Sequence, residues 1–135
     1  MIQVEGVHVG FDGREILHGV SFSVAPGRVA GYIGPNGAGK TTTMRLLTGT
    51  LRPDRGRVVV GGIDIARYPV EAKRRFGFVP EHGHLYESFS PEEYLRFIGR
   101  MHGMPERELE HRADSLLAFW GLADAARQPM AAFSK

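Results

Sequence analysis

The chain has 135 residues, of which 42% are hydrophobic and 24% are charged, and its formal net charge is +2. This composition is that of an ordinary globular domain with a modest core, and the charge is too small to argue for a nucleic-acid partner. The lack of cysteine excludes disulfides and thiolate metal sites, and no apolar run approaches the ~18 residues that span a bilayer.

The first part of the chain, residues 1–84, is predicted to be rich in strands. Apolar and polar residues alternate in some segments and apolar residues run together in others, and both patterns are typical of strands. Turn pairs such as Asp12-Gly13 and Gly61-Gly62 separate these segments. The predicted strands are residues 2–9, 19–24, 28–33, 57–60, 63–65 and 74–79.

The second part, residues 85–135, is predicted to be helical. Ser90, followed by proline and then by Glu93 three positions on, has the pattern of an N-cap with a capping box, and Gly103 is a suitable end. The apolar face of this helix is predicted from spacing to hold Tyr94, Phe97, Ile98 and Met101. A second helix, within residues 105–122, is predicted to bury Leu109, Ala113, Leu116, Leu117 and Trp120.

A glycine-rich segment between a predicted strand and a predicted helix that begins at Lys40 carries the chemistry. It matches the phosphate-loop pattern, a glycine, four residues and then Gly-Lys-Thr. Glycines let successive backbone N–H groups face one concavity, and the following helix directs its free N–H groups at the same anion. The predicted nucleotide-binding residues are Gly34, Pro35, Asn36, Gly37, Ala38, Gly39, Lys40, Thr41 and Thr42.

Two side chains of this phosphate loop, residues 34–41, are assigned individual roles. Lys40 is expected to reach the β- and γ-phosphates and to point at solvent without a ligand, and the Thr41 hydroxyl is placed to bind Mg²⁺. The predicted ligand is therefore a nucleoside triphosphate with Mg²⁺. The loop by itself leaves ATPases, GTPases and kinases open, although we find no candidate residues for the acceptor site of a small-molecule kinase.

The phosphate loop with its flanking segments, residues 19–49 and 53–65, resembles the ATP-binding domain of ABC transporters, and the likeness covers essentially the whole chain. It implies an α/β P-loop NTPase fold of the ABC ATPase type. An antiparallel N-terminal β-subdomain, the phosphate-loop helix, an incomplete central sheet and a helical subdomain are expected within residues 1–135 of a single domain. It also implies an ATP-binding component that couples MgATP binding and hydrolysis to export. The implied partners are a transmembrane permease subunit and a second ATP-binding subunit. Since no signal peptide is visible, we expect a cytoplasmic chain, peripheral to the inner face of the membrane.

The resemblance assigns roles to two further residues. Phe11 occupies the place of the aromatic residue that stacks on adenine, although the residues alone favour a core or turn aromatic. Glu81 stands where the family usually has a glutamine that contacts Mg²⁺ and the attacking water. A carboxylate there is a suitable Mg²⁺ ligand and adds negative charge beside the phosphates, and a plain surface glutamate is the alternative.

The end of the sequence, Phe133-Ser134-Lys135, resembles the start of the family's signature segment in its exporter variant. There Ser134 would contact the γ-phosphate of ATP held by the opposite subunit. The family's acidic strand, catalytic glutamate and switch histidine would follow residue 135. We therefore expect residues 1–135 alone to bind MgATP weakly and to hydrolyse it negligibly. The alternative function is a non-catalytic nucleotide-binding fragment or regulatory remnant.

Overall fold

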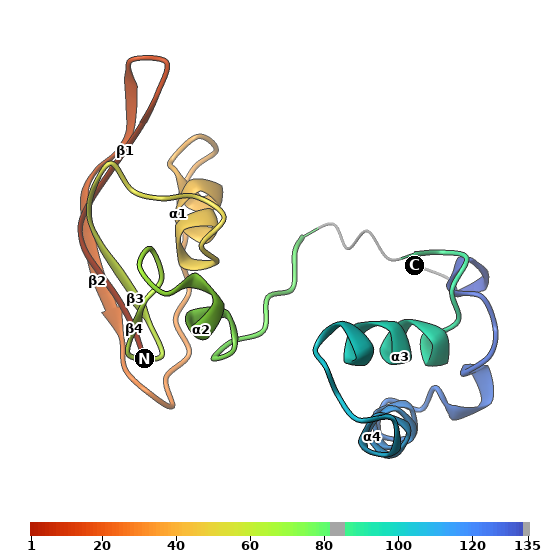
Figure 1. The fold of residues 1–135 in the computed structure, drawn as a ribbon. Coiled ribbons are helices and arrows are strands. Elements are labelled where there is room, and N and C mark those ends of the chain that lie inside the picture. Colours follow the sequence, from red (N-terminus) through yellow and green to blue (C-terminus); the bar gives the residue numbers. More distant parts are fainter. Residues whose placement is uncertain (82–85, 134–135) are drawn as a thin grey trace. The chain divides into compact units, whose positions relative to one another are not determined.

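The computed structural model describes residues 1–81 and 86–133, and the chain divides into two compact units, Met1–Val79 and Pro80–Lys135. Each unit is described by itself (Figure 1). Among the described residues, none of the helices has the length and apolar character that crossing a bilayer requires.

The first unit is built on a four-stranded antiparallel sheet with the order β2-β1-β3-β4. Its long hairpin turns at Asp12 and Gly13, whose φ angles of 50° and 76° suit a two-residue hairpin turn. Gly61 and Gly62 make the same kind of turn between the last two strands, as predicted. The strands are β1 (Ile2–Phe11), β2 (Arg14–Val24), β3 (Arg55–Val60) and β4 (Ile63–Asp64).

The core of this unit lies between the sheet and the helix α1 (Lys40–Leu47), which runs alongside the strands in Figure 1. Val4, Val7 and Val9 of β1 are all buried, although strict alternation would place Val4 and Val7 on opposite faces. An extra residue in β1 between them, where Gly6 has a φ of 53°, turns Val7 back to the core side. Leu46 of α1 is packed in the same cluster.

Two predicted strands are wrong, and one short helix was missed. Residues 28–33 and 74–79 are fully described but belong to no strand, and Val29 and Val79 are almost completely exposed. An apolar run becomes a strand only when a neighbouring strand pairs its backbone groups, and the sheet offers these segments none. The missed helix, α2 (Pro69–Lys73), is five residues long, too short for a periodic signal.

The second unit is a helical hairpin of α3 (Pro91–Met101) and α4 (Glu106–Phe119), followed by the 3₁₀ turns η1 (Ala123–Ala125) and η2 (Met130–Ala132). The helices meet closely at Gly99, where an added Cβ would lie 2.8 Å from Leu109 Cδ1. Three residues predicted from spacing to lie on the buried helix faces are exposed: Met101 by 71%, Trp120 by 70% and Leu116 by 45%. Leu109, Ala113 and Leu117 are buried as predicted, whereas the close approach at Gly99 is one that a hydrophobic pattern cannot reveal.

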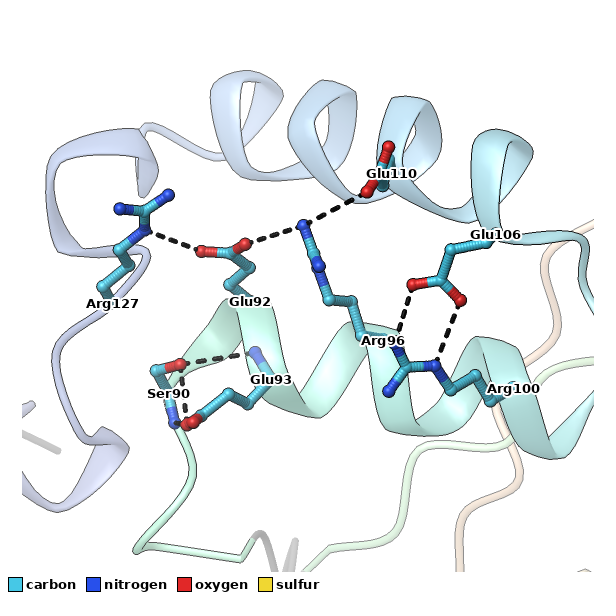
Figure 2. A network of polar contacts seen from close by, with 8 residues as sticks. All are labelled: Ser90, Glu92, Glu93, Arg96, Arg100, Glu106, Glu110 and Arg127. Atoms are coloured by element: carbon cyan, nitrogen blue, oxygen red, sulfur yellow. Dashed lines mark hydrogen bonds and ion pairs between the residues drawn. The ribbon is translucent and has the colours of Figure 1, made fainter.

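Ion pairs join the parts of this hairpin (Figure 2). The Glu92 carboxylate on α3 forms ion pairs with two arginines, at 3.1 Å between Oε2 and Arg127 Nε and at 2.9 Å between Oε1 and Arg96 Nη2. Arg96 also approaches Glu110 of α4 at 3.9 Å. Because such pairs near the surface are individually weak, apolar packing at the helix contact carries more of the stability.

The capping box at the start of α3 is confirmed. The Ser90 backbone N–H donates to Glu93 Oε2 at 2.8 Å, and the Glu93 backbone N–H donates to Ser90 Oγ at 3.3 Å (Figure 2). The bond from the Ser90 backbone, and then the bond from the Ser90 hydroxyl, lowers the pKa of the Glu93 carboxyl below its ordinary value of 4.5.

This shift predicts a pH effect on stability. A lowered folded-state pKa gives stability that is present above the unfolded-state pKa and is lost as pH falls through the folded-state value. From about pH 6 to about pH 3, the wild-type chain should therefore lose more unfolding free energy than Glu93→Gln, whose amide does not titrate. Urea unfolding of both chains at the two pH values measures this difference. Equal losses would mean that Glu93 does not contribute to acid stability.

Candidate functional site

The phosphate loop joins the extended segment before it to the first turn of α1. Two of its glycines, Gly37 and Gly39, have φ angles of 84° and 85°, a conformation that side chains disfavour. The Ala38 N–H donates to the Pro35 carbonyl at 3.2 Å and closes a turn at the tip of the loop. The backbone can follow this path because glycine occupies the two left-handed positions.

Gly39 also lies directly on strand β2. An added Cβ would be 2.5 Å from Leu17 Cδ2 and 3.6 Å from Ile16 Cγ2. Both side chains reach the glycine because β2 has an extra residue here: Val9 pairs with Leu17, and the next residue of β1 pairs with Glu15. The β1–β2 hairpin therefore forms the floor under the phosphate loop.

Lys40 does not point at solvent, which corrects the sequence-based expectation. Its ammonium group donates to the Gly34 carbonyl at 2.6 Å and to the Pro35 carbonyl at 2.8 Å. The side chain thus folds back across the loop and is only partly exposed. A lysine held this way places a positive charge over the loop, where an anion would meet it.

The first turn of α1 presents three threonines with different surroundings. Thr41 is exposed, Thr42 is partly exposed, and Thr43 is buried. Thr43 Oγ1 donates to the Gly39 carbonyl at 3.0 Å and lies 3.2 Å from the Tyr32 hydroxyl. The third threonine therefore anchors the loop to the helix, a role that the loop pattern did not indicate.

The surroundings of the loop fit an anion with an associated hard cation. The first N–H groups of an α-helix have no intrahelical acceptor, and they begin here at Lys40. The Thr41 hydroxyl is accessible beside them, and hydroxyl oxygen is a suitable Mg²⁺ ligand. The glycines add no side-chain bulk to the loop.

Phe11 lies at the end of β1, and its side chain is 44% exposed. It is two residues beyond Val9, which pairs with Leu17 under Gly39, so it lies ~7 Å farther along the strand. Alternation gives Phe11 and Val9 the same face of β1, the face that supports the loop. The hairpin tip and the phosphate loop are at the same end of the unit in Figure 1.

The comparison with known proteins decides the family of this chain. The sequence profile described as ABC transporter matches residues 17–135. The chain belongs to the ABC transporter family. It is 36% identical to the linearmycin resistance ATP-binding protein of Bacillus subtilis over 99% of its length, and 38% identical to a daunorubicin resistance ATP-binding protein of Streptomyces coeruleorubidus over 98%. It spans only 43% and 42% of these two relatives.

A solved ABC transporter structure, described as the ATP binding subunit of an ABC transporter, shares the fold. The TM-score is 0.84 at 34% sequence identity, and the match covers all of this chain and 56% of that one. The α/β P-loop NTPase fold predicted from the sequence is therefore confirmed.

Two further predicted ABC site residues belong to other parts of the chain. Glu81 is exposed and belongs to the second unit, so its role toward Mg²⁺ stays a prediction. Ser134 lies outside the described residues, and its contact with a second subunit likewise stays a prediction.

Proposed function

We propose that this chain is part of the ATP-binding component of an ABC exporter, which couples MgATP binding and hydrolysis to export through a transmembrane permease. The observation that carries the proposal is the phosphate loop itself. Two left-handed glycines, a lysine fixed across the loop at 2.6 and 2.8 Å, and a helix N-terminus come together at one surface of the loop. Such a surface suits the polyanionic tail of a nucleotide.

The proposed roles of the loop residues are supported by these positions, and those of Glu81 and Ser134 rest on the family resemblance. The loop amides and Lys40 bind the phosphates, and Phe11 supports the base. Thr41 would hold Mg²⁺ together with Glu81, and the metal would neutralise charge on the phosphate oxygens when bound. Ser134 would face the γ-phosphate of a nucleotide in a second ATP-binding subunit.

The direction of transport is supported by the names of the relatives. Two are resistance proteins for linearmycin and daunorubicin, and a third, from Ralstonia nicotianae, is a Nod factor export ATP-binding protein with 37% identity. We infer an export function, with the complex at the inner face of the membrane. The transported substrate would be selected by the permease.

Equilibrium titration with MgATP and with magnesium tripolyphosphate tests the nucleotide site. MgATP should bind more tightly than tripolyphosphate, because stacking of the base on an aromatic ring contributes about 1–3 kcal/mol. Phe11→Ala should remove this advantage and leave tripolyphosphate affinity unchanged. No saturable binding of either ligand would contradict the proposed function, whereas an unchanged MgATP affinity in Phe11→Ala would remove only Phe11 from the site.

A further inference from the structure

Asp54 bonds to strand β1 through both its backbone and its side chain. Its N–H donates to the His8 carbonyl at 2.9 Å, and its carboxylate Oδ2 accepts the Gly10 N–H at 2.7 Å. Gly10 directly precedes Phe11. The carboxylate thus holds the strand one residue before the aromatic ring.

The bond to Gly10 takes the place of a missing strand. β3 starts at Arg55, which pairs with His8, so the sheet on this side ends just before Gly10. The Gly10 N–H would otherwise face solvent at the open edge of β1, and the Asp54 carboxylate supplies the acceptor that a longer β3 would have provided. On the other side, the extra residue of β2 makes the pairing of Gly10 with Glu15 irregular.

The backbone at Gly10 also has little room to move. An added Cβ would lie 3.2 Å from the Arg14 carbonyl oxygen, so the two strands approach closely here. The hairpin tip is therefore fixed by a tight approach to β2 on one side and by Asp54 on the other.

Asp54 connects this tip to the far end of the phosphate-loop helix. The segment that leads to it leaves α1 through Thr50 and Leu51, whose N–H groups donate to the Arg45 carbonyl at 2.9 and 3.1 Å. The near end of α1 contacts the same hairpin where Gly39 rests on Leu17. Both ends of α1 therefore hold the hairpin that carries Phe11.

We propose that Asp54 is a positioning residue for the nucleotide base, which sets the distance and orientation of Phe11 relative to the phosphate loop. The inference rests on the proposed function, because it needs Phe11 to support the base. Asp54 itself touches no nucleotide in this scheme. Its carboxylate is exposed and lies in an open cavity of about 400 Å³ that is also lined by His8, Arg14, Glu15 and Arg55. Because the carboxylate is exposed, we expect its loss to lower MgATP affinity only moderately.

The test compares Asp54→Ala with Asp54→Asn in the full 135-residue chain. Alanine removes the acceptor, and MgATP affinity should fall about threefold to tenfold, the factor that one solvent-accessible hydrogen bond corresponds to. Asparagine keeps an oxygen acceptor and should restore most of the affinity. Magnesium tripolyphosphate, which has no base, should bind all variants equally. Asp114→Ala, an exposed aspartate of α4, controls for the loss of one negative charge.

A second measurement follows the hydrogen bond directly. Amide hydrogen exchange at Gly10 should accelerate in Asp54→Ala and stay near the wild-type rate in Asp54→Asn. The inference is overturned if Asp54→Ala binds MgATP like the wild type, if tripolyphosphate affinity falls equally, or if asparagine fails to restore binding. A wild-type chain that binds MgATP and tripolyphosphate equally would instead overturn the proposed role of Phe11, and this inference with it.

Discussion

Lys40→Ala is expected to lower MgATP affinity by about 100-fold or more, because the Lys40 ammonium group has two roles in the proposed site. The ammonium group would bind the phosphates directly, and it also holds the loop through the Gly34 and Pro35 carbonyls. Its removal takes away a ligand-binding charge and lets the empty loop relax. Isothermal titration with MgATP measures the loss.

The structure adds a second expectation for the same variant. Since Lys40 bonds two carbonyls without ligand, Lys40→Ala should also lower the unfolding free energy, by about 1 kcal/mol. Lys73→Ala, on the exposed side of α2, removes the same charge and should change neither quantity appreciably. Retained MgATP affinity in Lys40→Ala would show that the site is wrongly assigned.

Gly39→Ala is expected to lower the unfolding free energy by about 2–5 kcal/mol and to abolish MgATP binding. A left-handed φ costs a side chain about 1–2 kcal/mol. The new Cβ would in addition approach Leu17 Cδ2 to 2.5 Å, and overpacking of this kind typically costs about 1–3 kcal/mol. The loop can relieve the contact only by moving off β2, which disperses the amides that would bind phosphate.

Gly27→Ala provides the matched control for this prediction. Gly27 has a similar φ of 71°, but an added Cβ there meets nothing within 4 Å. Its cost should therefore be that of the backbone conformation alone, about 1–2 kcal/mol, and MgATP affinity should be unchanged. Urea unfolding and MgATP titration of both variants separate the two terms. Equal destabilisation by the two substitutions would mean that the contact with Leu17 does not matter.

The predictions that held are those in which the determining residues are neighbours in sequence. The start of α3 followed from Ser90 and Glu93, because a capping box is made within one helical turn. The Asp12-Gly13 hairpin followed from two residues that tolerate positive φ. The helix after the phosphate loop began at Lys40 as expected.

The predictions that failed depended on distant partners. Residues 28–33 and 74–79 have strand-like composition, but a strand exists only where another strand accepts its backbone hydrogen bonds. Spacing predicts Met101 and Trp120 on the buried helix faces, but both are mostly exposed, and the close approach of the two helices lies at Gly99 and Leu109.

The sequence by itself determined the family of this protein through its motifs, and the loop of glycines before Lys40 and Thr41 predicts a phosphate site through local backbone freedom and local charge. Only the tertiary structure decided how that loop is held. Packing of the folded chain sets three contacts. These are the contact of Gly39 with Leu17, the bond from Lys40 to the Gly34 carbonyl, and the bond from the Gly10 N–H to Asp54. The physical reason is that such contacts depend on where the folded chain brings atoms together, which no local pattern encodes.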